Sequence, residues 1–111
     1  MAARDQLDRT LAALAEPKRR QTVDLLRARP MRAGDLAEAL TLTPPATSRH
    51  LRVLRQAGLV EERSDAADAR VRIYSLASAG MRELHDWLAE TETLWSDQLD
   101  AFRRHVDAAA K

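Results

Sequence analysis

The sequence predicts a mainly helical α+β fold with about five helices and a two-stranded β-hairpin. Three observations support this prediction. Apolar residues recur at three- and four-residue steps through most of the 111-residue chain, the spacing of helices buried along one face. After Gly58 the pattern changes to that of short strands, and prolines and glycines separate the segments. With 45% hydrophobic and 32% charged residues the composition is that of a globular protein, and we expect residues 1–111 to form one domain.

Two helices are expected at the start of the chain. Residues 4–15 place Leu7, Leu11 and Leu14 on one stripe, and Pro17 then begins a second helix over residues 17–28. Three basic residues fall in the first turn of this second helix, where their charge opposes the helix dipole: Lys18, Arg19 and Arg20. We expect them to be exposed to solvent, and a contact with a phosphate group is the alternative.

A short third helix, residues 33–40, is expected to precede a turn and a fourth helix over residues 44–57. Thr43 can accept a hydrogen bond from a free backbone N–H at the N-cap, and Pro44 suits the first helical position because it lacks an N–H. Gly58 can take the left-handed conformation that ends a helix. Two short helices joined by a tight turn, the second of them basic, form a helix-turn-helix.

The fourth helix has the surface expected of a helix that binds the major groove of DNA. Residues 39–60 contain three arginines and no acidic residue. Leucines at helical spacing give this helix an apolar back, and its front carries hydroxyl and arginine groups that can bond base edges or phosphates. The alternative is a basic face that is only solvated. Together with two residues of the predicted hairpin, the expected DNA-contacting residues are Pro45, Thr47, Ser48, Arg49, His50, Arg52, Arg55, Arg70 and Arg72.

A hairpin should follow, with strands at residues 59–64 and 71–76 and a polar tip between them. Beside a recognition helix, such a hairpin is a wing. Arg70 can reach the adjacent minor groove or pair with Asp68 to hold the hairpin, and both roles are compatible. The wing also carries acidic residues that would repel phosphate groups: Glu61, Glu62, Asp65 and Asp68. The fourth helix is therefore the stronger candidate for DNA contact.

One long helix is expected from Ser78, which can cap it, to about Ala109. Its apolar residues follow three- and four-residue steps and include both tryptophans and the only phenylalanine of the chain. This stripe either packs against the first helix within the chain or, as we expect, joins two chains in a twofold dimer. The expected dimer residues are Leu7, Leu11, Leu14, Trp87, Leu88, Leu94, Trp95, Leu99, Phe102 and Val106.

Composition and charge exclude several classes of function. The chain has no cysteine, which excludes disulfides, thiolate metal sites and cysteine redox sensing. No glycine-rich phosphate loop or nucleophile set indicates an enzyme, so we expect no catalytic residue, cofactor or metal. The start lacks a secretory signal, and no apolar run approaches the roughly 18 residues that cross a bilayer, which predicts a cytoplasmic protein without a membrane partner. Residues 1–76 carry a net charge of +4 and residues 77–111 of −3, which favours a DNA surface in the first part.

Three segments of the chain resemble the ArsR/SmtB family of bacterial winged-helix repressors: residues 11–20, 34–40 and 47–60. The third is the most specific, because Ser-Arg-His-Leu precedes Leu-x-x-x-Gly-Leu-Val in it. The resemblance implies a winged helix-turn-helix in which residues 44–57 form the recognition helix. It also implies that Thr47, Ser48, Arg49 and His50 face DNA. His50 can instead bond the helix to the rest of the fold or to a phosphate.

The resemblance does not extend to metal sensing. Many members of that family bind metals through cysteines in the third helix or through Asp, His and Glu on the last helix. Here the third helix has no cysteine, and His85 and His105 lie about 30 Å apart along one helix, so they could meet only across a dimer. The tail, with Trp87 followed by Leu94-Trp95-x-x-x-Leu99, resembles the metal-independent branch of the family.

The wing departs from that family in another way. Asp68-x-Arg70 followed by Leu76-x-x-x-Gly80 is similar to the MarR family.

Taken together, these features predict a homodimeric transcriptional regulator, a repressor by resemblance, that binds a double-stranded DNA operator. A small-molecule effector bound between the helices is compatible with this prediction. The alternative is a winged-helix protein-interaction module that does not bind DNA, and salt-sensitive binding of a duplex would separate the two.

Overall fold

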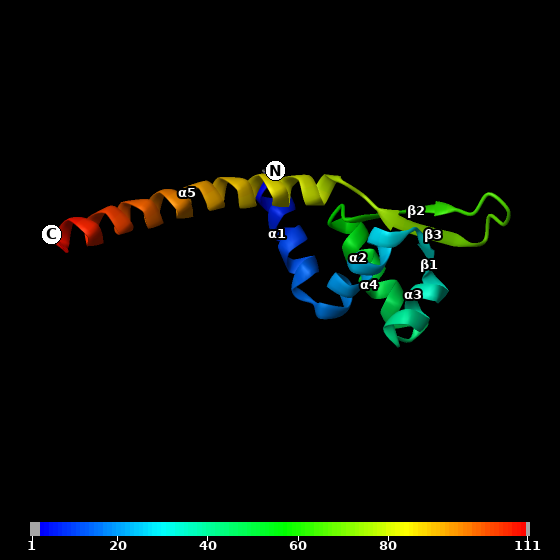
Figure 1. Ribbon diagram of the computed structural model, residues 1–111. Coiled ribbons are helices and arrows are strands. Elements are labelled where there is room, and N and C mark those ends of the chain that lie inside the picture. The colour runs from blue at the N-terminus through cyan, green and yellow to red at the C-terminus, as the bar shows by residue number, and fades with distance from the viewer. Residues whose placement is uncertain (1–2, 111) are drawn as a thin grey trace.

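The computed structural model describes residues 3–110 and confirms a mainly helical fold with a small antiparallel sheet (Figure 1). All five helices and the two strands of the hairpin begin and end within one residue of the positions that the sequence predicts. In chain order the elements are α1 (Ala3–Ala15), α2 (Pro17–Ala28), β1 (Met31–Arg32), α3 (Ala33–Leu40), α4 (Pro44–Gln56), β2 (Val60–Ser64), β3 (Arg72–Leu76) and α5 (Ala79–Ala109).

The sheet has three strands in the order β1-β3-β2, and not the two that the sequence predicts. β2 and β3 form the expected hairpin, with Val60 opposite Leu76 and Ser64 opposite Arg72. The additional strand β1 pairs Met31 with Tyr74. A two-residue strand has no periodicity, and its pairing depends on residues more than 40 positions away, so no local pattern reveals it.

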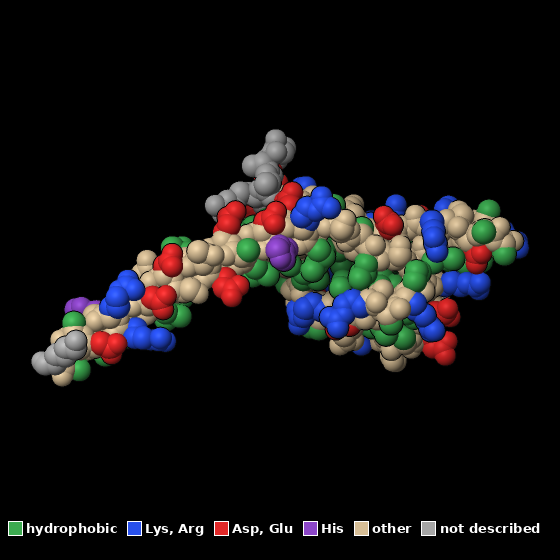
Figure 2. All heavy atoms as spheres, turned by 45° about the horizontal axis from the view of Figure 1, so that its top comes forward, with side chains coloured by type: hydrophobic (Ala, Val, Ile, Leu, Met, Phe, Trp, Pro, Cys, Tyr) green, Lys and Arg blue, Asp and Glu red, His purple; other side chains and the backbone are tan. Residues whose placement is uncertain are grey.

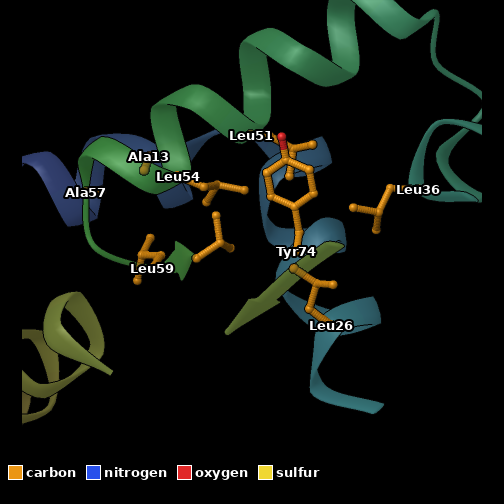
Figure 3. Packing of buried hydrophobic residues seen from close by; sticks show 9 residues of the cluster. Ala13, Leu26, Leu36, Leu51, Leu54, Ala57, Leu59 and Tyr74 are labelled. Carbon is orange, nitrogen blue, oxygen red and sulfur yellow. The ribbon is translucent and has the colours of Figure 1, made fainter. Parts of the chain in front are cut away.

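The core lies between the helix-turn-helix, α2 and the sheet. Leu36 of α3 and Leu51 and Leu54 of α4 are almost completely buried and lie around Tyr74 of β3 (Figure 3). Leu26 of α2 completes this side of the cluster. Each buried leucine contributes about 1.5–3 kcal/mol through removal of its apolar surface from water. This packing fixes which face of α4 points inward.

From the sequence, the three basic residues at the start of α2 are expected to be exposed to solvent. In the structure they instead donate hydrogen bonds to backbone carbonyls of other helices. The Arg19 Nε donates to the carbonyl oxygen of Ala13 at 2.6 Å, and an Arg20 Nη donates to that of Leu14 at 2.6 Å. The Lys18 Nζ donates to the carbonyl oxygen of Leu40 at 2.8 Å. Carbonyls at helix ends lack partners within the helix and carry the negative end of its dipole, so these cations stabilise the ends of α1 and α3.

The end of α4 is a junction with both terminal helices. The carbonyl oxygen of Ala57 accepts from the Gln6 Nε2 at 2.6 Å and lies 3.4 Å from the Thr10 hydroxyl, both on α1. The N–H of Gly80, in the first turn of α5, donates to the carbonyl oxygen of Gly58 at 3.0 Å. Gly58 has the left-handed φ of 73° that the sequence predicts for the end of this helix.

α5 leaves the body of the molecule after its first turns (Figure 1). Its beginning packs against α1, where Leu84 is buried, and its C-terminal part extends the molecule to 71 Å along its longest axis. Every residue from 92 to 110 is exposed. Ser78 precedes this helix as predicted, but its side chain makes no capping hydrogen bond. Within residues 3–110, every helix is too short or too polar to cross a membrane.

Candidate nucleic-acid interface

α4 is held with one face in the core and the other in solvent. The Thr43 hydroxyl accepts from the N–H of Ala46 at 3.3 Å, which confirms the predicted cap, and Pro44 occupies the first helical position. Because Leu51 and Leu54 are buried, the opposite face is exposed. That face presents Pro45, Ser48, Arg49, Arg52 and Gln56.

Arg49 and Arg52 are the two central cations of the exposed face. Within residues 3–110, neither forms a salt bridge, and both are exposed. An arginine without a carboxylate partner keeps its full charge and all its donors available for a guanine edge or a phosphate. Ser48 lies beside them and can donate or accept. This is the surface that the sequence predicts for the front of the helix.

Thr47 does not belong to that surface, and the sequence prediction placed it there wrongly. Its side chain is only 2% exposed, and its hydroxyl donates to the carbonyl oxygen of Thr43 at 3.0 Å. The position explains the burial, because Thr47 lies four residues before Leu51 and seven before Leu54, on the same stripe of the helix. Its small size and its intrahelical bond let a hydroxyl occupy a core position.

His50 lies at the edge of α4 that faces α1 and α2, and not at the centre of the exposed face. It is half-buried, and its Nδ1 lies 3.2 Å from an Arg19 Nη. A guanidinium only donates, so the imidazole nitrogen accepts this bond. Since Arg19 also caps α1, this contact connects the recognition helix to the end of α1. The structure therefore favours the alternative role for His50, a bond to the rest of the fold.

Arg55 lies at the other end of α4 and is partly neutralised. One of its Nη atoms lies 3.5 Å from a carboxylate oxygen of Glu62 on β2. The same oxygen accepts from the Tyr74 hydroxyl at 2.7 Å. Burial, followed by this hydrogen bond and the negative charge of Glu62, raises the pKa of Tyr74 above its usual value of 10.0. Arg55 thus connects α4 to the wing as well as facing solvent.

The wing arginines have partners within the hairpin. The Arg70 Nε lies 3.2 Å from the Asp68 carboxylate. This is the pairing within the hairpin that the sequence predicts as one of two roles for Arg70. This side-chain bond, together with the N–H of Arg70, lowers the pKa of Asp68. The guanidinium of Arg72 donates to the Ser64 hydroxyl at 3.1 Å. Both arginines are exposed, so neither pairing prevents a contact with DNA.

Arg32 is a further cation of this surface that the sequence prediction missed. It lies 3.2 Å from the Asp65 carboxylate at the wing. Together with Ser48, Arg70 and Arg72 it lines an open groove between α3, α4 and β3. Its place there depends on the pairing of β1 with β3, and no signal in the sequence indicates that pairing.

The residues expected at a dimer interface divide into two groups. Leu7 is buried against the rest of its own chain, and Leu14 and Trp87 are half-buried. The others remain exposed in the single chain, with Trp95 at 63% and Phe102 at 66%. Green apolar side chains lie along the projecting part of α5 in Figure 2. The exposed members are Leu11, Leu88, Leu94, Trp95, Leu99, Phe102 and Val106.

The described part of the chain contains no group of three or more His, Asp or Glu side chains placed to hold a metal ion. His85 is exposed and lies 3.5 Å from Asp86 on its own helix. His105 lies near the far end of α5, so the two histidines are separated within the chain.

Comparison with known proteins places this arrangement among bacterial regulators. Residues 16–62 match the family described as bacterial regulatory protein, arsR family. The chain is 32% identical over 82 residues to the transcriptional repressor SdpR of Bacillus subtilis. The aligned residues cover 74% of this chain and 88% of that protein. It is 35% identical over 101 residues to the HTH-type transcriptional regulator Rv2034 of Mycobacterium tuberculosis, covering 91% of this chain and 89% of that protein.

A solved structure has the same fold. It is the solution structure of a homodimeric winged helix-turn-helix DNA-binding domain from Mycobacterium bovis, described as a possible ArsR-family transcriptional regulator. It is 27% identical to this chain and superimposes with a TM-score of 0.62, covering 81% of this chain and 82% of that one.

Proposed function

The chain belongs to the arsR family of bacterial regulatory proteins, and we propose that it acts in the cytoplasm as a homodimeric repressor that binds a double-stranded DNA operator. Two copies of α4 enter successive major grooves, one from each subunit. The proposed DNA-contacting residues are Pro45, Ser48, Arg49, Arg52, Arg55, Arg70 and Arg72, with His50 at the edge of the surface.

The observation that carries this proposal is the exposure of Arg49 and Arg52. Both project from a helix whose opposite face is held in the core by Leu51 and Leu54. Burial of that face leaves the arginine face as the one that can enter a groove. Arginine forms two hydrogen bonds with a guanine edge, and each such pair is worth about 1–3 kcal/mol of discrimination against other bases.

The proposed dimer uses the exposed apolar stripe of α5, together with Leu11 of α1. Six large apolar side chains between residues 88 and 106 are each 46–66% exposed, which is costly for a chain that remains alone in water. A second copy of α5 is the partner that we propose, because an apolar stripe on a helix matches another copy of itself across a twofold axis. The homodimeric relative from Mycobacterium bovis supports this choice.

The proposal is tested with an operator selected by the wild-type protein from a library of random duplexes. It should contain two inverted half-sites whose centres lie one helical turn, or a multiple of it, apart. Arg49→Ala and Arg52→Ala should each weaken binding by about 5–150-fold, the equivalent of 1–3 kcal/mol. Arg104→Ala is the matched control, because this exposed arginine lies near the end of α5, far from α4 (Figure 1). It should leave binding unchanged.

A second measurement tests the dimer. Trp95→Ala combined with Phe102→Ala should convert the dimer to a monomer in sedimentation experiments and weaken operator binding. Wild-type protein that selects no duplex, even at low salt, would contradict DNA binding and favour the protein-interaction alternative. Equal loss of binding in Arg104→Ala and Arg49→Ala would contradict the assignment of α4.

A further inference from the structure

A groove that is open to solvent lies between the start of α3, α4 and the wing. Its polar lining consists of Arg32, Asp35, Ser48, Arg70, Arg72 and Tyr74. We call it the wing groove. It adjoins the exposed face of α4 through Ser48, so a duplex bound to that face would pass its backbone along this groove.

Two of the three arginines of the wing groove are already paired with carboxylates. Arg32 lies 3.2 Å from Asp65. The Arg70 Nε and Nη2 lie 3.2 and 3.3 Å from the two oxygens of Asp68. Only Arg72 bonds a neutral partner, the Ser64 hydroxyl, among the side chains that the structure describes.

We propose that the wing groove binds a phosphate group of the DNA backbone, and that Asp65 and Asp68 compete with this phosphate for Arg32 and Arg70. The proposal rests on the proposed function and deepens it in two respects. It adds Arg32 to the residues that contact DNA. It also gives two acidic residues a role in lowering the affinity for any duplex.

The physical basis is an exchange of partners. The side chains of Arg32 and Arg70 are largely exposed, at 58% and 90%, although that of Asp65 is only 17% exposed. Because water screens both arginines, their ion pairs contribute little to the stability of the free protein. A phosphate offers the same two-oxygen geometry as a carboxylate and can replace it. After the exchange the carboxylates remain beside the DNA and repel it. Since phosphates carry no base identity, this effect should be equal for operator and random duplexes.

Asp65→Asn and Asp68→Asn test the competition without disturbing the hairpin turn. One carboxylate oxygen of Asp65 accepts from the N–H of Ala67 at 2.8 Å, and one of Asp68 accepts from the N–H of Arg70 at 3.0 Å. In each variant the amide oxygen of the new asparagine can accept the same backbone bond as the carboxylate oxygen that it replaces. Each variant should bind operator and random duplexes several-fold more tightly, with a steeper fall of affinity with salt, because a free cation displaces more counterions from DNA.

Arg32→Ala tests the added contact. It should weaken binding to all duplexes alike and reduce the slope of log affinity against log salt by about 1. Asp24→Asn is the matched control, because it removes the same charge from an exposed Asp–Arg pair on α2, 3.6 Å from Arg27 and outside the wing groove. The melting temperature of each variant should be measured as well, to check that it remains folded.

Two results would overturn the proposal while leaving the proposed function intact. One is that Asp65→Asn and Asp68→Asn bind no more tightly than Asp24→Asn, although Arg49→Ala still weakens operator binding. The other is an unchanged salt slope in Arg32→Ala. A wild-type protein that binds no duplex would instead overturn the proposed function as well, and this is seen before any variant is compared.

Discussion

Gly80 lies where α5 crosses the end of α4, and replacing it with alanine should destabilise the protein. A Cβ at this position would overlap the carbonyl oxygen of Ala57. It would also lie 3.1 Å from both the Leu59 Cδ2 and the Thr10 Oγ1. The closest of these atoms belongs to the backbone and cannot rotate away, so α5 or the end of α4 must move.

The expected cost combines three effects. Forcing a methyl group into a packed site costs about 1–3 kcal/mol. Displacement of the Ala57 carbonyl weakens its bond with Gln6, worth about 0.5–1.5 kcal/mol. Alanine is favoured over glycine in a helix by about 0.5–1 kcal/mol, which offsets part of this cost. The free energy of unfolding should therefore fall by about 0.5–4 kcal/mol, and Tm by on the order of 10 °C.

Gly34→Ala provides a control of the opposite sign. Gly34 is also in the first turn of a helix, but nothing lies within 4 Å of the position of its Cβ. Without a clash, the preference of the helix for alanine should raise stability by up to about 1 kcal/mol. The stability of both variants should be measured by heat and by urea unfolding. All samples should have the same protein concentration, because the melting temperature of a dimer depends on concentration. A Gly80→Ala protein as stable as Gly34→Ala would refute the reasoning.

Two further outcomes are expected. Tyr74 is the only tyrosine of the chain, so its ionisation can be followed by near-ultraviolet absorbance. The midpoint should lie above pH 10.0. A midpoint at or below that value would contradict the buried contact with Glu62. Because the folded protein raises this pKa, the contribution of Tyr74 to stability should be complete below about pH 10 and decline as the pH rises through its folded pKa. Thr47→Val should leave operator affinity within about twofold of wild type, because the lost hydroxyl bonds Thr43 and not DNA, and the variant should cost about 1 kcal/mol of stability. A loss of binding as large as that of Arg49→Ala would return Thr47 to the contact surface.

The sequence predicts the recognition helix well because its signals are local. Thr43, Pro44 and Gly58 fix its ends by backbone chemistry within a few residues. Its apolar stripe identifies the buried face through the periodicity of the helix. The same periodicity places Thr47 on the buried stripe of the helix. Its hydroxyl, next to that of Ser48, suggests instead that Thr47 belongs to the exposed polar face. The misplacement of Thr47 therefore came from residue type and not from position.

The contacts that the sequence does not predict are those made between distant segments. Lys18, Arg19 and Arg20 have the appearance of a solvated cluster, and only the arrangement of helices shows that they bond the ends of α1 and α3. Arg32 lines the wing groove only through the pairing of β1 with β3. In each case a long side chain can reach several partners, and the tertiary structure selects one.

The junction at the Ala57 carbonyl has a consequence for the operators that this regulator can use. Side chains of α1 bond this carbonyl directly, and the first turn of α5 lies against it. In a dimer joined through the terminal helices, no flexible linker would separate the dimer interface from the recognition helices. One base pair inserted between the half-sites would shift one of them by about 3.4 Å and turn it by roughly 35°. The protein would have little freedom to follow, so its natural sites should share one spacer length.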